Sequence, residues 1–73
     1  MSHIYSLKAV VNGNNIKINK YFTSRNQAIS YMFNYYENNY LYNMQVEEEY
    51  EKEKHIVEYV CDYNNRFTVA RVA

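Results

Sequence analysis

The sequence predicts an α+β fold in which two β-hairpins flank one helix, and three short stretches support it. Asn12-Gly13 lies between two segments of alternating apolar residues, and Asn-Gly is the strongest short signal for a hairpin turn. Residues 24–40 carry apolar side chains at helical spacing. Asn64-Asn65 separates two further strand-like segments. We therefore expect a single domain, residues 1–73, with a four-stranded antiparallel sheet and the helix on one of its faces.

The first hairpin can be predicted in detail, because a two-residue turn fixes which residues oppose each other. A tight Asn-Gly turn places Ala9 opposite Ile16 and Leu7 opposite Ile18. Side chains alternate along a strand, so these four share one face and Lys8 lies on the other. One side of this hairpin should therefore face the core.

The helix is predicted to begin after Ser24, which acts as its N-cap. Gln27 follows three residues later, so the pair fits a capping box, in which side chains satisfy the first backbone donors of a helix. A stripe of apolar residues should cover the sheet, and it consists of Ile29, Met32, Phe33, Tyr36 and Tyr40.

Residues 44–55 read MQVEEEYEKEKH, a segment too rich in charge for a core helix. The adjacent carboxylates Glu47, Glu48 and Glu49 repel one another. A charged strand, a helical extension and a mobile loop all fit this composition, and the pattern does not separate them. Because charge runs are usually solvated, we expect the segment at the surface.

The closing stretch, residues 55–73, carries apolar side chains on both faces of a predicted hairpin. A turn at its two adjacent asparagines places Val60 opposite Val69 and Glu58 opposite Arg71, a pair of opposite charges. One helix covers only one side of a small sheet, so the second side is expected to meet another chain, unless the acidic segment folds over it. The residues predicted to self-associate share one face of this hairpin and are Ile56, Val60, Phe67 and Val69.

Composition places the chain among cytoplasmic proteins that do not enter membranes. No run approaches the ~18 apolar residues that a membrane-spanning helix requires, and the first residues do not resemble an export signal. The single Cys allows no internal disulfide and fits a reducing compartment. With neither a disulfide nor a zinc cluster to reinforce so small a core, a homodimer is expected.

Catalysis and metal binding are not expected from the residues present. Cys61 and His55 share a strand face, but six residues of strand separate them by roughly 20 Å, too far for a thiol and its base. The spacing of Cys and His matches no zinc motif. A single Gly in the chain excludes a glycine-rich phosphate loop. We therefore predict no catalytic residues, no metal and no cofactor.

Charge argues against nucleic acid as the partner. The net charge is zero, and it divides unevenly, with four cations and one carboxylate in residues 1–43 and four cations and seven carboxylates in residues 44–73. A basic face with Tyr5 and Tyr21 could stack bases, but a chain with an acidic half is a poor ligand for a polyanion.

Recognition of another protein is the function that these residues favour. Tyr offers large contact area with a polar tip, and ten Tyr occur in the chain. The acidic segment could occupy a basic groove of a target. The residues predicted to bind the partner protein are Tyr31, Tyr35, Tyr42, Glu47, Glu48, Glu49 and Tyr50.

Three stretches carry the ββαββ pattern of the chain: VVNGNNIKI, TSRNQAISYMFNYY and VEYVCDYNNRFTVARV. In this pattern, in its size and in its Asn and Tyr content, the chain resembles small phage proteins that block host defence, the group that includes the anti-CRISPR proteins. The resemblance implies inhibition of a host protein by contact in the host cytoplasm, often as a dimer and without turnover. An alternative within the same group is a sponge that sequesters a nucleotide signal between subunits, with Arg66, Arg71 or Lys17 as the cations. A small nucleic-acid-binding module is the remaining alternative.

Overall fold

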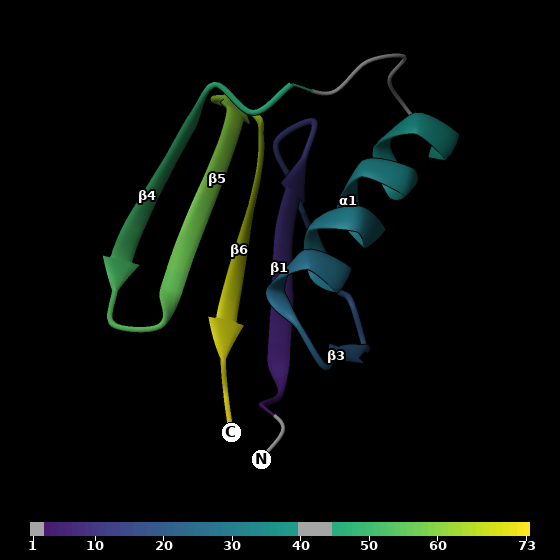
Figure 1. Cartoon of the computed structure of the whole chain (residues 1–73). Coiled ribbons are helices and arrows are strands. Elements are labelled where there is room, and N and C mark those ends of the chain that lie inside the picture. Colours follow the sequence, from purple (N-terminus) through teal and green to yellow (C-terminus); the bar gives the residue numbers. More distant parts are fainter. Residues whose placement is uncertain (1–2, 40–44) are drawn as a thin grey trace.

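One antiparallel sheet of six strands, with one helix against one of its faces, forms the described part of the chain (Figure 1). The computed structural model describes residues 3–39 and 45–73. In chain order, the elements are β1 (Tyr5–Val11), β2 (Asn14–Ile16), β3 (Tyr21–Phe22), α1 (Arg25–Asn39), β4 (Glu48–Glu53), β5 (Ile56–Asp62) and β6 (Asn65–Arg71). The α+β class is confirmed, whereas the prediction of four strands is wrong.

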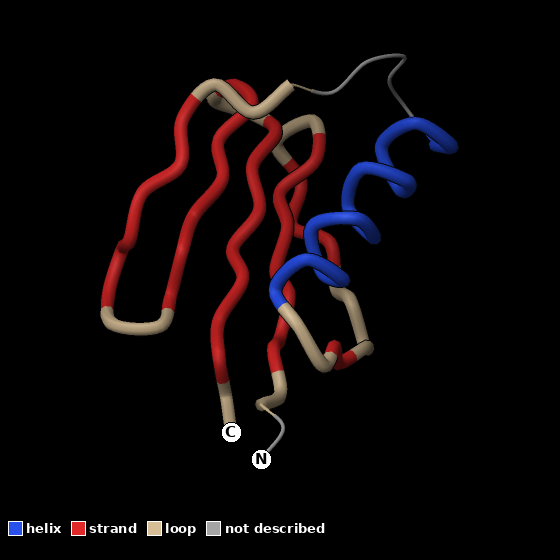
Figure 2. The backbone as a smooth tube through the Cα atoms, viewed as in Figure 1, coloured by secondary structure: helices blue, strands red, loops and turns tan. Residues whose placement is uncertain are grey.

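The strand order is β2-β1-β6-β5-β4, and β3 pairs with β1 next to β2. Figure 2 shows the strands side by side in red and the single helix in blue on one side of them. The two additional strands have separate origins. The second arm of the first hairpin is interrupted at residues 17–20 and continues as β3, and the charged segment before β5 forms β4.

The turn of the first hairpin is as predicted. Asn12 and Gly13 have φ angles of 53° and 81°, so both central residues are left-handed, as the type I′ turn of a two-residue hairpin requires. Ala9 pairs with Ile16. The expected pairing of Leu7 with Ile18 is absent from the ladder, because β2 ends at Ile16 and the chain returns to β1 only at β3.

The helix begins where the sequence predicts. The Gln27 backbone N–H donates to Ser24 Oγ (3.2 Å), which confirms Ser24 as the N-cap. The Gln27 side chain reaches back to Thr23, whose N–H and hydroxyl donate to Gln27 Oε1 at 3.0 and 2.8 Å. The return bond of the capping box therefore falls one residue earlier than in the usual pattern.

The core lies between α1 and the near face of the sheet. Its helix residues, Ala28, Met32 and Tyr36, are fully buried, and Ile29 and Phe33 are only partly buried at the sides of this stripe. The Tyr36 hydroxyl donates to the Val10 carbonyl oxygen (3.3 Å), so its polar atom is satisfied inside the core. Tyr40 lies outside the described residues. The remaining buried apolar residues are Leu7, Ala9, Val11, Phe22, Val57, Tyr59, Phe67 and Val69.

The closing hairpin has a different register from the predicted one. The expected pairs, Val60 with Val69 and Glu58 with Arg71, are wrong, and the ladder is irregular between Val60 and Asp62. A shift by an odd number of residues moves a whole strand's side chains to the other face. The observed pairs are Val57 with Val69, Tyr59 with Phe67, and Val60 with Arg66.

Side-chain hydrogen bonds explain this register. Asp62 Oδ1 accepts from the Asn64 N–H (2.8 Å), which closes the turn at Tyr63 and Asn64 rather than at Asn64 and Asn65. Asn65 is buried at the start of β6, where its Nδ2 donates to both carboxylate oxygens of Asp62 and its Oδ1 accepts from the Asn12 N–H (3.1 Å). The two hairpin turns are therefore joined through one buried side chain.

Candidate functional site: an open sheet face and an acidic edge

The face of the sheet that points away from α1 is formed by the side chains that alternate with the core residues. Paired residues project to the same side of a sheet, so the ladder arranges this face in rows across the strands. We call it the open face, and its rows are Ser6, Ala70 and Ile56, then Lys8, Thr68, Glu58 and Tyr50, and then Val10, Arg66, Val60 and Glu48.

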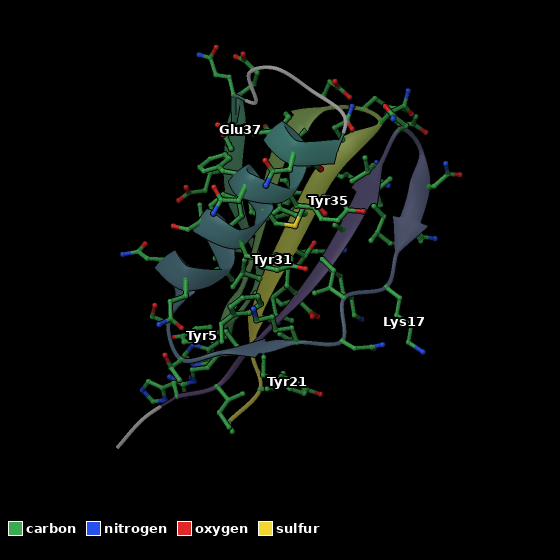
Figure 3. All side chains as sticks on the ribbon, turned by 90° about the vertical axis from the view of Figure 1, so that its right-hand side faces the viewer. Tyr5, Lys17, Tyr21, Tyr31, Tyr35 and Glu37 are labelled. Atoms are coloured by element: carbon green, nitrogen blue, oxygen red, sulfur yellow. The ribbon has the colours of Figure 1, made fainter. Side chains whose placement is uncertain are left out.

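Among the described residues, no segment crosses the open face. Its aliphatic side chains Val10, Ile56 and Val60 are only partly buried, in contrast to the fully enclosed core. Figure 3 shows α1 with Tyr31 and Tyr35 on one side of the sheet and Lys17 and Tyr21 directed to the other. The sequence prediction of a hairpin with apolar residues on both faces therefore holds, although the residues on each face differ from those expected.

Small side chains make the open face hollow toward the end where β1 begins and β6 ends. Ser6, Thr68 and Ala70 line a groove of about 550 Å³, and longer residues surround it, including Lys8, Lys52 and Tyr21. The Tyr21 side chain is 70% exposed. The groove is therefore wide enough for a side chain of a partner or for a small ligand.

Charges on the open face are divided between its two sides. Lys8 lies on β1, and its ammonium group has no hydrogen bond or ion pair with another described residue. Glu48 and Glu58 lie on β4 and β5. The Glu58 carboxylate accepts a hydrogen bond from the Tyr50 hydroxyl, and this bond raises the pKa of Tyr50. The face thus has a basic side at β1 and a mainly acidic side at β4 and β5, where Lys52 is the exception.

Strand β4 is the acidic edge of the sheet. All six of its residues are exposed, and four of them are glutamates: Glu48, Glu49, Glu51 and Glu53. It pairs only with β5 among the described elements, so its other backbone edge is unpaired. Glu49 and Glu51 oppose Tyr59 and Val57 and therefore lie on the α1 side of the sheet. Dense charge and an irregularity between Glu51 and Glu53 are common features of edge strands that resist aggregation.

The residues predicted to bind a partner do not form one surface. Tyr31 and Tyr35 stack on the helix at 6.4 Å, and Tyr31 also contacts Phe22 of β3 (5.5 Å between ring centroids). Residues 47–50 lie at the opposite edge of the sheet, on and just before β4. Tyr42 lies outside the described residues.

The residues predicted to self-associate are also divided. Ile56 and Val60 lie on the open face, whereas Phe67 and Val69 are 1% exposed and belong to the core. Sequence reasoning placed Lys8 on the face away from the core, but it missed that Lys8 and Val10 line up with Thr68 and Arg66 across β1 and β6 on the open face. Their alternation is visible in the sequence, but their alignment depends on the pairing of β1 with β6, segments about 60 residues apart.

Two side chains with chemical reactivity lie at opposite ends of one strand. Cys61 is near the end of β5, and His55 is in the turn that precedes it, with a φ of 66°. Burial, followed by the charges of Asp62 and Glu47, raises the pKa of Cys61 to about 11, so the thiol is protonated at neutral pH. Within residues 3–39 and 45–73, no group of three His, Cys, Asp or Glu side chains is placed to bind a metal ion.

The tyrosines Tyr5 and Tyr21, considered above as a base-stacking pair, lie on opposite faces. Tyr5 pairs with the buried Phe22 and packs against the core, whereas Tyr21 pairs with Ser6 on the other side of the sheet. Lys20 is also drawn to the helix side, with its ammonium 5.1 Å from the centre of the Tyr31 ring. These residues therefore do not form one continuous basic and aromatic surface.

No protein-family model matches the chain, and neither a curated protein nor a solved structure matches it. The resemblance to phage inhibitors therefore stays a prediction from the sequence. No helix in the described part of the chain has the length and apolar character needed to cross a membrane.

Proposed function

We propose that this chain is a non-catalytic binding protein that acts on a target protein by contact, and that the acidic edge meets a basic surface of that target. The observation that carries the proposal is β4, an edge strand with six exposed residues, four glutamates and a backbone edge that no other described strand pairs with. Unpaired edges accept an additional strand, and dense negative charge selects a basic one. This reading agrees with the sequence-based expectation of a phage-type inhibitor that blocks a host protein.

Electrostatics also favours the acidic edge as the recognition element. Glu47, Glu49 and Glu51 are exposed, and none of them forms an ion pair with another described residue. Complementary charge accelerates association and excludes targets of the wrong sign. We therefore expect capture of the target to weaken as salt is added.

The test compares two charge reversals of equal size. Glu49→Lys changes the acidic edge, and Glu37→Lys changes an exposed glutamate of α1 that lies outside it. Tagged wild-type protein and both variants are used to capture proteins from a bacterial lysate, and mass spectrometry quantifies what each retains. We expect a protein that the wild type and Glu37→Lys retain and Glu49→Lys loses. Equal retention by both variants would remove the acidic edge from the proposal.

A nucleotide sponge is a second candidate, because the groove of the open face brings Lys8, Lys52 and Tyr21 together. Two ammonium groups suit a phosphate, and an exposed Tyr ring suits a base. A ligand that binds the folded state raises its melting temperature, so a panel of cyclic and ADP-ribose-type nucleotides tests this candidate by thermal shift. A shift that Lys8→Ala and Lys52→Ala abolish would support it, and no shift with any member would reject it.

A further inference from the structure

We propose that the open face binds a second copy of this chain, in a two-fold dimer whose axis runs along β6. This inference goes beyond the proposed target contact, because it uses the open face and leaves the backbone edge of β4 exposed. It also corrects the surface expected from the sequence, since Phe67 and Val69 are buried within one copy. The apolar content of the open face, its area and the position of its charges all favour a second copy.

Partly buried aliphatic residues lie in the two outer rows of the open face. Val10 and Val60 flank Arg66 in one of these rows, and Ile56 adjoins Ala70 in the other. A hydrophobic surface of this kind on a small domain is stabilised when another chain removes it from water. The chain has few other means of adding stability, because it has no disulfide and a core of modest size.

The area of the open face reaches the lower limit for a specific interface. The 32 strand residues of the sheet, at a rise of ~3.3 Å per residue and a strand spacing of ~4.8 Å, give roughly 500 Å² of sheet per copy, or about 1,000 Å² for two copies. Specific interfaces begin at about 1,000 Å² of buried surface. Sheets that pack face to face lie ~10 Å apart, and the small Thr68 and Ala70 at the centre allow this approach.

The charges select one orientation of the second copy. Lys8, Thr68 and Glu58 occupy one row, with Thr68 on β6 between the other two. A two-fold axis along β6 exchanges the two sides of each row, so it places Lys8 over Glu58 of the partner subunit, and the reverse contact forms by symmetry. A two-fold axis across the strands would instead bring Lys8 toward Lys8 of the partner subunit, which like charges oppose.

The same axis also matches the neighbouring row and the side chains close to the axis. Val10 lies over Val60 of the partner subunit, so an apolar pair adjoins each ion pair. Arg66 lies near the axis, but its guanidinium donates to the Tyr63 carbonyl oxygen (2.7 Å) and is drawn toward the turn. Glu58 accepts one bond from Tyr50 and keeps further acceptor positions for an ammonium group.

The experiment is a charge exchange followed by the mass of the protein in solution. Multi-angle light scattering and analytical ultracentrifugation measure wild type, Lys8→Glu, Glu58→Lys and the double exchange, from micromolar to near-millimolar concentration. We expect a dimer for the wild type, a dimer affinity at least about tenfold lower for each single variant, and recovery in the double variant. Lys54→Glu, in the turn between β4 and β5, is the control with the same change of charge and should remain a dimer.

Each result supports or overturns the proposal. A wild-type protein that is monomeric at every concentration would overturn it. If the wild type is a dimer but the double exchange does not recover its affinity, the proposed orientation of the two copies would be wrong. If Glu58→Lys does not fold, as judged by circular dichroism, Thr68→Arg serves instead. In the proposed dimer the two new Arg side chains would face each other across the two-fold axis and repel. We expect Thr68→Arg to be a folded monomer, and a folded Thr68→Arg dimer would exclude the open face as the interface.

Discussion

Replacing Phe67 by Ala is the most direct test of how the closing hairpin is folded. The sequence places Phe67 on a self-associating surface, whereas the structure places it in the core at 1% exposure. Its ring stacks on Tyr59 with 4.8 Å between centroids and meets the edge of Phe33 at 6.4 Å. The two placements predict different consequences, because a core ring stabilises one copy and a surface ring stabilises only the assembly.

The expected cost follows from burial. Removing a fully buried Phe side chain costs about 3 to 5 kcal/mol, through lost hydrophobic transfer and the cavity that remains. A domain of 73 residues has a total stability of roughly 4 to 11 kcal/mol. Phe67→Ala should therefore lose a large part of that stability, and its melting temperature should fall by more than about 12 °C.

Val60→Ala is the matched control, because Val60 is only partly buried on the open face. We expect it to cost the single chain about 1 kcal/mol or less. Urea unfolding followed by circular dichroism, at two protein concentrations, measures both variants. The loss in Phe67→Ala should be the same at both concentrations, and the loss in Val60→Ala should grow with concentration if a second copy covers it. A loss in Phe67→Ala no larger than that in Val60→Ala would refute the register described here.

Three further predictions concern the turns and the buried hydroxyl. Gly13→Ala should lower the free energy of unfolding in urea by about 1 to 2 kcal/mol, because the φ of 81° is unfavourable for Ala. Steric overlap adds little, since a Cβ at this position would come no closer than 3.6 Å to Asn64 Oδ1. An unchanged urea midpoint would contradict the turn geometry. Asn65→Ala should lower the free energy of unfolding by about 1 to 3 kcal/mol, because the Asn12 N–H and the Asp62 carboxylate lose their buried partner. Asn64→Ala is the control and should lower it by less, since the backbone hydrogen bonds of residue 64 are kept. Burial raises the pKa of Tyr36, so this hydroxyl ionises more readily in the unfolded chain, and stability should fall as the pH rises above about 10. In Tyr36→Phe the fall in stability should be less steep. An equally steep fall would show that another group causes it.

The helix start and the first turn could be predicted because their causes are local. Ser24 and Gln27 are three residues apart, and their hydrogen bonds form within one turn of helix. Asn12 and Gly13 adopt positive φ angles at little cost, which suits a two-residue hairpin wherever the rest of the chain lies. The core stripe was predicted less well, since Ala28 is fully buried, whereas the expected Ile29 and Phe33 are only partly buried.

The charged segment shows how pairing overrides local preference. Glu48, Glu49 and Glu51 have little tendency to form a strand, and a strand is only one of the structures that their sequence allows. In the structure β5 supplies the backbone hydrogen bonds, and all the charged side chains remain in water. The free energy of this pairing comes from a neighbouring strand, so residues 48–53 alone do not specify it.

The sequence by itself determined the fold class, the helix N-terminus and the Asn-Gly turn, because each depends on groups a few residues apart. Only the tertiary structure decided which face of the closing hairpin is buried. That choice depends on Asn65, whose side chain accepts a hydrogen bond from Asn12, 53 positions earlier in the chain. The pairing of β1 with β6 then aligns Lys8 and Glu58 in one row, and contacts between such distant segments form only when the whole chain is folded.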